Sequence, residues 1–203
     1  AHGRLTSATD AEGTRRWTID ADGVREQSGL EHDAAGRLVR RTDGAGETRY
    51  AYDAFGRLAE VTREGVVVRY AYDGLGRVVA RTTDEGTTRY LYERGQRLAE
   101  VGPGDRVRVW IHGPATDEPL AYIDVIEGEV GDWVYLHADA LGTVLAYSDE
   151  EGAATDRAAL DPWGEVLEAP EGDRALLFAG RLVDVDTGLV DLRARFYAPE
   201  LGR

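Results

Sequence analysis

Aspartates that stand three residues before a glycine are the side chains of this sequence best placed to do chemistry. The stretches Asp149-Glu150-Glu151-Gly152 and Asp161-Pro162-Trp163-Gly164 have this form, and His137-Ala138-Asp139 sets an imidazole near a carboxylate. Such groups could bind calcium, transfer protons or cleave the chain at an aspartate. A turn gives the aspartates a simpler role, because their side chains bond the backbone two residues on and glycine supplies a positive φ. We expect the turn role at Asp149 and Asp161, and local packing or hydrogen bonding for His137.

The remaining histidines and acidic clusters do not show metal-ligand spacing. His2, His32 and His112 lie far apart, and neither Asp10-Ala11-Glu12-Gly13 nor Asp20-Ala21-Asp22-Gly23 matches the twelve-residue calcium loop. The chain has no cysteine, which excludes disulfides and thiolate metal sites. It also has no Gly-x-Ser-x-Gly elbow and no phosphate-binding glycine loop. We therefore expect no catalytic residue, no metal and no cofactor.

The aspartate-to-glycine stretch recurs with a period of twenty residues, marked by Gly36, Gly56 and Gly76. A histidine or tyrosine stands before each aspartate, and an arginine and an aliphatic residue follow each glycine. A fourth copy keeps the spacing but has Gln96 in place of the glycine, and an earlier pair, Gly3 and Gly23, is also twenty residues apart. The repeat residues are Tyr52, Asp53, Gly56, Arg57 and Leu58 in one copy, Tyr72, Asp73, Gly76 and Arg77 in the next, and Tyr92 and Arg97 in the fourth.

Each twenty-residue unit predicts two strands and two turns. Segments such as 66–72 are rich in β-branched and aromatic residues, and the repeats contain no ten-residue stretch of helical periodicity. Because a lone hairpin is marginal in water, we expect successive hairpins to pair edge to edge in one curved antiparallel sheet. The second turns fall between copies, at Asp43-Gly44-Ala45-Gly46, Arg63-Glu64-Gly65 and Asp84-Glu85-Gly86.

Side chains of the repeats are expected to interact across turns and strands. Asp53 would pair with Arg57, and Asp73 with Arg77, across their turns; such exposed pairs define geometry more than stability. The tyrosines of successive units would share matching faces of the sheet and stack across strands. These rings are Tyr50, Tyr52, Tyr70, Tyr72, Tyr90 and Tyr92.

The acidic balance of the chain limits its partners. Thirty-eight acidic and 24 basic residues give the 203-residue chain a net charge of -14. This disfavours a nucleic-acid backbone and an anionic membrane surface as partners. No apolar run approaches the ~20 residues of a membrane-spanning helix, and no targeting signal is recognisable. Methionine is absent even at position 1, so we expect a processed product or an excised piece.

Tyr-Asp-x-x-Gly-Arg-Leu at this spacing resembles the YD repeat of the Rhs family, and the second half strengthens the likeness. Residues 133–167 resemble the start of the Rhs-associated core domain, and residues 178–203 resemble its end, with Thr-Gly-Leu followed by Arg-Ala-Arg-Phe-Tyr. The departures, none of which breaks the pattern, are His32, Gln96, Thr143, Trp163 and Ala198. The core residues that carry the resemblance are His137, Asp139, Leu141, Gly142, Asp161, Pro162, Gly164, Gly188, Leu189, Arg193, Arg195 and Tyr197.

The resemblance implies an all-β fold of continuous antiparallel hairpin repeats in a curved, spiralling sheet. It implies a repeat region over residues 1–108 and the Rhs-associated core over 109–203, ending just before the family's self-cleavage motif. Rhs proteins are bacterial polymorphic toxins of interbacterial competition, related to animal teneurins, and their repeats form a shell around a C-terminal toxin. The implied function is a non-catalytic segment of such a shell, secreted or at the cell surface within a larger protein. The implied partners are the rest of the shell, the toxin cargo or further copies of the chain.

Two other functions and three geometries stay open at this point. A glycan-binding module would stack sugar rings on aromatic side chains, and an autoprotease would be built on acidic residues, for which Asp161 is a candidate. About 20 strands would give roughly 95 Å of sheet, short of the ~145 Å circumference around a cargo of about 130 residues. The chain would then be a piece of a longer wall, part of a ring completed by other copies, or a sheet curled around its own side chains. The candidate glycan-stacking rings are Tyr50, Tyr70, Tyr90, Trp110 and Trp133.

Overall fold

The computed structural model describes residues 7–10, 13–16, 29–44, 46–170 and 176–203. This part of the chain consists of strands, turns and one 3-10 turn, η1 (Phe178–Gly180), with no helix that is long and apolar enough to cross a membrane. The strands are β1 (Ser7–Asp10), β2 (Gly13–Arg16), β3 (Leu30–His32), β4 (Leu38–Asp43), β5 (Gly46–Tyr52), β6 (Leu58–Arg63), β7 (Val66–Tyr72), β8 (Val78–Thr83), β9 (Gly86–Glu93), β10 (Gln96–Val101), β11 (Arg106–His112), β12 (Pro119–Ile126), β13 (Glu129–Ala138), β14 (Val144–Ser148), β15 (Ala154–Arg157), β16 (Ala159–Leu160), β17 (Val166–Glu168), β18 (Val190–Asp191) and β19 (Phe196–Tyr197).

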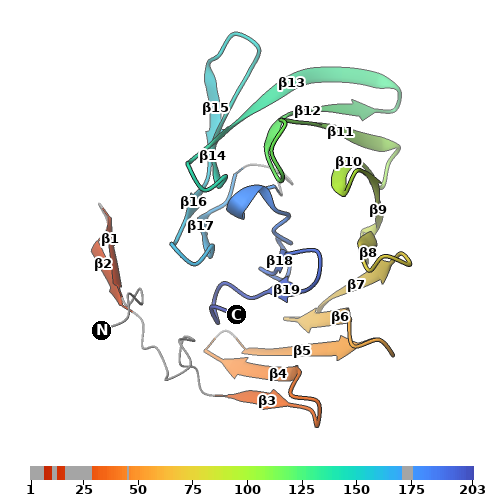
Figure 1. Cartoon of the computed structure of the whole chain (residues 1–203), viewed down its shortest axis with the longest axis vertical. Helices are drawn as coiled ribbons and strands as arrows, with labels where there is room; N and C mark the ends of the chain where they lie inside the picture. Colours follow the sequence, from red (N-terminus) through yellow and green to blue (C-terminus); the bar gives the residue numbers. More distant parts are fainter. Residues whose placement is uncertain (1–6, 11–12, 17–28, 45, 171–175) are drawn as a thin grey trace.

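Thirteen strands, β3 to β15, form one antiparallel sheet in which each strand pairs with its neighbours in the sequence. Figure 1 shows this sheet curving from β3 round to β15 as an open arc. At about 4.8 Å per strand the arc spans roughly 60 Å, less than the roughly 20 strands expected from the sequence would give. The prediction of an all-β, curved sheet of antiparallel hairpins is confirmed. Three two-stranded sheets, β1–β2, β16–β17 and β18–β19, complete the described structure.

Two kinds of turn alternate along the repeats. At Asp53–Arg57 the Gly56 amide donates to the Asp53 carbonyl and the Asp53 amide to the Arg57 carbonyl, with Gly56 at φ 79°. This is a three-residue loop closed by a left-handed glycine and a bulge. Between β6 and β7 the loop has two residues, Glu64 and Gly65, both at positive φ, as in a type I′ turn. Both turns lie where the sequence predicts them, within one continuous sheet.

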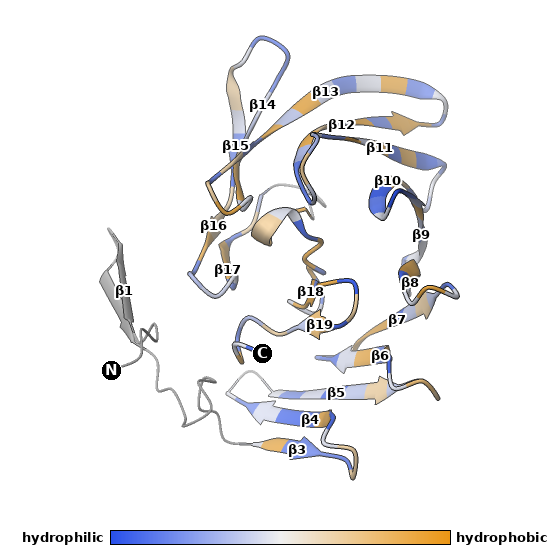
Figure 2. Cartoon of the chain, viewed as in Figure 1, coloured by the Kyte–Doolittle hydropathy of each residue, from blue (hydrophilic) through white to orange (hydrophobic). Residues whose placement is uncertain are grey.

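The concave face of the arc carries the core. Along β5 and β7 the residues alternate between buried and exposed, so that Tyr50, Val68 and Tyr70 point inward. Figure 2 shows the same alternation of hydrophobic and hydrophilic residues along β13. Residues 176–203, here called the inner segment, lie inside the arc (Figure 1) and pack apolar side chains against it. The apolar residues that the inner segment adds to the core are Leu176, Leu177, Leu182, Val183, Leu189 and Val190.

The sheet continues across residue 108, where the sequence predicts a boundary between the repeat region and the core region. This position falls inside β11, which pairs with β10 on one side and β12 on the other. The sheet therefore has no break at this position, and the division into a repeat region (1–108) and a core region (109–203) stays a prediction from the family resemblance.

The arc is open and curves around residues 176–203, and the choice among the three geometries stays a prediction. Its concave face is occupied by the inner segment, which the repeat pattern does not predict.

Candidate functional site

The aspartate of each repeat organises its turn through three hydrogen bonds. Asp53 Oδ1 accepts bonds from the backbone amides of Phe55 and Arg57, both at 2.9 Å, and Oδ2 accepts one from Arg57 Nε at 2.7 Å. Asp33 and Asp73 accept the same three bonds in their own turns. The expected pairing of Asp53 with Arg57, and of Asp73 with Arg77, is confirmed.

These bonds shift the acidity of the turn carboxylates. The guanidinium group of Arg37 is the largest cause that lowers the pKa of Asp33, and the backbone amide and guanidinium group of Arg77 lower the pKa of Asp73. Each turn is therefore built around a carboxylate that holds its charge more firmly than an isolated aspartate does.

The arginine and the tyrosine then connect each turn to the neighbouring repeat. The guanidinium group of Arg57 lies over the ring of Tyr72, 4.5 Å from its centre, and the Tyr72 hydroxyl donates to the Leu58 carbonyl oxygen at 2.6 Å. The same pair of contacts joins Arg37 with Tyr52 and Arg77 with Tyr92. We call these two contacts together the clamp; it links each turn to the next repeat, once every twenty residues.

The tyrosines share a face as predicted, but the expected cross-strand stacking of their rings is wrong. They lie on alternate strands, too far apart for ring contact, since neighbouring strands are about 4.8 Å apart. Arginine groups and the inner segment fill the space between them, for example where the rings of Tyr70 and Phe196 lie 4.6 Å apart.

The same turn recurs in the second half of the chain, where the sequence offered candidates for chemistry. Asp161 Oδ1 accepts bonds from the amides of Trp163 and Glu165, and Asp139 and Asp149 form equivalent turns. The turn conformation expected at Asp149 and Asp161 is confirmed. His137 lies beside Ser148, with its Nε2 atom 2.9 Å from the serine hydroxyl oxygen, as expected for a local contact.

The part of the chain that the structure describes contains no group of three or more His, Asp or Glu side chains that could hold a metal ion. His32 and His112 lie in different parts of the arc, in β3 and β11. His2 and the acidic stretch Asp20-Ala21-Asp22-Gly23 lie outside the described residues, as do Ala11 and Glu12 and the glycine pair Gly3 and Gly23.

The aromatic residues proposed to stack on sugars do not form an exposed platform. Tyr50, Tyr70, Tyr90 and Trp110 are between 2% and 9% exposed and pack in the core. Trp133 is half-buried. The glycan-binding hypothesis therefore loses four of the five rings on which it rested.

The fourth copy of the repeat departs from the others in structure as in sequence. Arg94 and Gly95 form a two-residue turn at positive φ, which brings Glu93 opposite Gln96. The guanidinium group of Arg97 is then buried, stacks 3.8 Å from the centre of the Tyr90 ring, and lies 3.7 Å from Asp191 of the inner segment. Arg97 thus faces the core rather than the next turn.

A buried ionic network joins the inner segment to the middle of the arc. Asp184, whose side chain is fully buried, accepts hydrogen bonds from the Tyr70 hydroxyl (2.6 Å) and from Arg81 Nε (2.8 Å). Burial, followed by the neighbouring Asp184 carboxylate, raises the pKa of Tyr70 well above its ordinary value, so the hydroxyl keeps the proton that it donates. This network joins the inner segment to β7 and β8.

Charged pairs at two other places also join the inner segment to the rest of the described chain. Glu200 pairs with Arg41 and, at 3.4 Å, with Arg63. Asp117, in the loop before β12, pairs with Arg181 at 2.8 Å and Arg193 at 2.6 Å.

The structure brings together the two second-half segments that carry the family resemblance. The Tyr197 hydroxyl donates to the Trp163 carbonyl oxygen at 2.8 Å, and the Tyr197 ring stacks on Phe178. A Cβ on Gly164 would come within 2.6 Å of the Phe178 ring, so glycine lets these segments meet.

The other predicted core residues are distributed over turns and the inner segment. Leu189 is buried beside the left-handed Gly188, whereas Leu141 is 80% exposed next to Gly142. Pro162 and Arg195 are exposed. These residues support packing and turns rather than one shared reactive centre.

Sequence reasoning did not identify Asp184, Arg81 and Glu200, which hold the inner segment in place. A local signal existed for Asp184, because Asp184-Val185-Asp186-Thr187-Gly188 is another acid-to-glycine turn, with the Gly188 amide donating to the Asp184 carbonyl at 2.7 Å. No such signal marks its partner Arg81, which lies 103 positions earlier.

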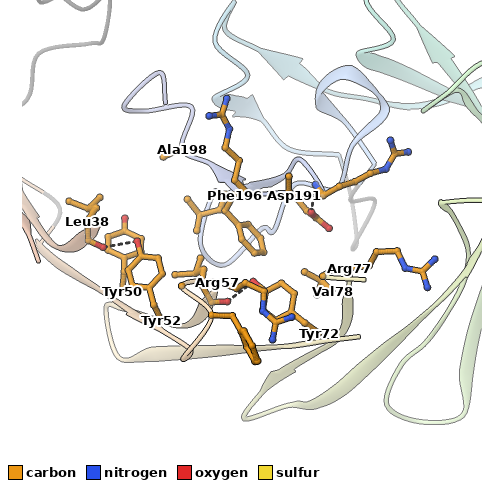
Figure 3. A pocket seen from close by; sticks show the side chains of 18 of the residues that line it. Leu38, Tyr50, Tyr52, Arg57, Tyr72, Arg77, Val78, Asp191, Phe196 and Ala198 are labelled. Atoms are coloured by element: carbon orange, nitrogen blue, oxygen red, sulfur yellow. Dashed lines mark hydrogen bonds between the residues drawn. The ribbon is translucent and has the colours of Figure 1, made fainter. Parts of the chain in front are cut away.

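A groove of about 810 Å³ opens between two of the repeat turns and the inner segment. We call it the turn groove; Figure 3 shows it with Arg57 and Tyr72 on one side and Phe196 and Asp191 on the other. Its walls come from the turns 53–57 and 73–77 and from residues 189–203. Seven repeat residues and three inner-segment residues predicted from the sequence line it together: Tyr52, Gly56, Arg57, Leu58, Tyr72, Gly76, Arg77, Leu189, Arg193 and Arg195.

Comparison with known protein families gives one match that covers most of the chain. The family model described as Teneurin YD-shell matches residues 19–203. Among solved structures, a chain in the crystal structure of TcdB2-TccC3-Cdc42 is similar, with a TM-score of 0.61 and 20% identity over 85% of this chain and 9% of that chain. At this identity the structural likeness supports the fold alone.

Two bacterial toxins are similar in sequence. Toxin protein Tse5 of Pseudomonas aeruginosa is 31% identical over 211 residues, which cover 96% of this chain and 16% of the toxin. Double-stranded DNA deaminase toxin A of Burkholderia cenocepacia is 30% identical over 204 residues, which cover 89% of this chain and 14% of that toxin. The chain therefore spans about a sixth of the length of these relatives.

Proposed function

Because the chain belongs to the teneurin YD-shell family, we propose that it is a wall segment of a shell that encloses a toxin carried by the same protein. The segment supplies containment and performs no catalytic step of its own. Similarity to two bacterial toxins supports a toxin as the cargo and an exported bacterial protein as the setting. The remainder of the shell and the cargo are the proposed partners.

The clamp between successive turns is the observation that carries this proposal. Each arginine that pairs with its own aspartate also lies over the tyrosine of the next repeat, as Arg57 does with Asp53 and Tyr72. A contact that repeats with the period of the sequence can be extended without limit by adding hairpins, which is what a wall requires.

The inner segment gives this part of the wall a second proposed role. Its apolar residues fill the concave face, and its carboxylates pair with arginines of β4, β6 and β8. We propose that residues 109–203, the predicted core region, close the shell at this end, and that the cargo lies beyond the filled part of the arc.

A protease-protection experiment tests containment. The open reading frame that contains this chain is expressed with whatever coding sequence flanks it, and the product is digested with increasing amounts of trypsin, which cleaves after the chain's arginines. Trypsin is expected to digest any downstream domain at least tenfold more slowly in the long product than when that domain is expressed alone.

The control for this experiment is the same downstream domain fused to an unrelated, stable protein. Equal digestion rates in the long product and in this fusion would contradict containment. A reading frame with no further repeats and no additional domain would contradict it as well.

A further inference from the structure

We propose that the turn groove binds an extended peptide segment with large apolar and acidic side chains. This inference rests on the proposed function, since an incompletely folded cargo is the natural source of such a segment. It adds a binding site and the chemistry of its ligand to a wall that otherwise acts only as a container.

Two large apolar side chains stand in the open at the rim of the groove. Phe55 is 83% exposed and Leu75 is 81% exposed, and both occupy the position before the left-handed glycine of their turns. The turn itself does not require an apolar residue there, because the equivalent position of the first copy is Ala35. Both rim residues line the same groove, whose deeper wall includes Leu58 and Val78. An apolar guest would cover both rim side chains at once.

The charge of the groove is opposite to that of the chain. Five of its described lining residues are arginines, and Asp191 is the acidic one, whereas the whole chain has a net charge of -14. Arg57 and Arg77 pair with turn aspartates, and Arg193 pairs with Asp117. Arg195 is exposed, and no described carboxylate pairs with it. A guest that brings carboxylates would meet this unpaired guanidinium group and would be favoured over a basic one.

The spacing of the rim side chains suits an extended chain. Successive repeat turns are two strands apart in the sheet, which is about 10 Å. A guest in the extended polyproline II conformation advances about 3.1 Å per residue with three residues per turn, so side chains three residues apart lie on the same side, about 9 Å apart, and would reach Phe55 and Leu75. The ligand we infer has two apolar residues at this spacing with acidic residues beside them.

A fluorescent peptide with two leucines three residues apart, each flanked by glutamates, tests the site directly. Fluorescence anisotropy with the full chain is expected to show saturable binding that weakens as salt is raised. Phe55→Ser and Leu75→Ser are each expected to weaken binding about tenfold, because each removes the burial of one large side chain. Arg195→Glu is expected to weaken it as well.

Matched variants and peptides make the result specific. Leu141→Ser changes an equally exposed leucine of an equivalent turn outside the groove, and Arg89→Glu changes an exposed arginine elsewhere on the sheet; neither is expected to alter binding. A peptide with lysines in place of the glutamates, and one with serines in place of the leucines, are expected to bind at least tenfold more weakly.

Several outcomes would overturn the inference. They are no binding of the acidic peptide, equal binding of the lysine peptide, or equal loss with Leu141→Ser. Concentration-dependent self-association that disappears in Phe55→Ser would instead assign the groove to a second copy of the chain. Retained protection of a downstream domain in Phe55→Ser and Leu75→Ser would leave the containment proposal intact, so the two proposals fail separately.

Discussion

The tyrosine hydroxyl ties each hairpin of the repeat region to the hairpin before it. Tyr52, Tyr72 and Tyr92 each donate to a backbone carbonyl fourteen positions earlier, with distances of 2.6 to 2.8 Å. The sequence shows the recurrence of these tyrosines but not their acceptors, because the curvature of the sheet determines which carbonyl lies within reach.

Removing one of these hydroxyls tests its contribution. Tyr72→Phe keeps the ring under Arg57 but leaves the Leu58 carbonyl without its donor, so we expect the free energy of unfolding to fall by about 1 kcal/mol. Urea denaturation followed by fluorescence measures the change. Tyr135→Phe, at a residue that is 41% exposed, is the control and is expected to have no effect. Equal losses in both variants would show that the hydroxyl bond contributes nothing.

The turn carboxylates make stability depend on pH in the acidic range. The pKa values of Asp33 and Asp73 are lowered in the folded chain, so near the ordinary aspartate value of 3.8 the unfolded chain binds more protons than the folded one. Their contribution is therefore fully present well above pH 3.8 and is lost as the pH falls below that value and through the lowered pKa values.

We expect Asp73→Asn to flatten this loss, because the amide still accepts backbone bonds but no longer titrates. The measurement is the free energy of unfolding across the acidic range for both proteins. Asp84→Asn, in an exposed turn between β8 and β9, is the matched control and should keep the original slope. A slope in Asp73→Asn as steep as in the unchanged chain would contradict the role given to this carboxylate.

Among the elements, the three-residue turn is the part most completely predictable from the sequence. Its aspartate, glycine and arginine act over a span of five residues, so the local sequence contains nearly all the determinants. The fourth copy shows where prediction from the local sequence fails. Gln96 replaces the glycine, a shorter turn forms at Arg94 and Gly95, and Arg97 moves into the core. Whether a buried guanidinium group is tolerated there depends on Tyr90 and Asp191, which the local sequence does not place.

The glycines of one turn provide an internally matched test. Gly76 has φ 81° and no neighbour within 4 Å of an added Cβ, so Gly76→Ala is expected to cost about 1 to 2 kcal/mol through backbone strain alone. Gly74 lies in the same turn, also in open space, without a positive φ. Gly74→Ala is expected to be neutral or to stabilise by about 0.5 kcal/mol. Thermal and urea unfolding of both variants decide the matter, and the opposite ranking would refute the assigned turn geometry.

At the scale of the whole molecule, one buried carboxylate positions the inner segment. Asp184 satisfies Tyr70 and Arg81 in the middle of the arc, where water is excluded. Asp184→Asn would leave Arg81 without its main partner, and we expect a loss of about 3 kcal/mol. Asp186→Asn alters a carboxylate of the same turn that is 39% exposed and also pairs with Arg81; we expect a loss of at most about 1 kcal/mol there.

Calorimetry and limited proteolysis report this difference, with early cleavage within residues 176–203 expected in Asp184→Asn alone. Similar unfolding temperatures for the two variants would mean that the inner segment is held by its apolar residues and not by this network.

The position of the inner segment is the part of the fold that the sequence did not reveal. Strand periodicity and turn residues report on pairing between neighbours, whereas the contact between Tyr70 and Asp184 joins residues 114 positions apart. The resemblance pointed to Leu189, Arg193 and Arg195 as important, but it did not say that they meet the repeat turns. The turn groove is formed by the repeat turns and the inner segment together, so it could not be predicted from the sequence.

Because each of the thirteen strands pairs with its neighbours in the sequence, the sheet can form in the order in which the chain is synthesised. Within the sheet, β3 is synthesised first and β15 last. Each strand after β3 can pair with the strand synthesised just before it, so the arc can form progressively during translation. Residues 176–203 emerge only afterwards. Until then Tyr70 and Arg81 lack their partner Asp184, and the apolar concave face is uncovered. The nascent arc is therefore the form most exposed to chaperones and proteases.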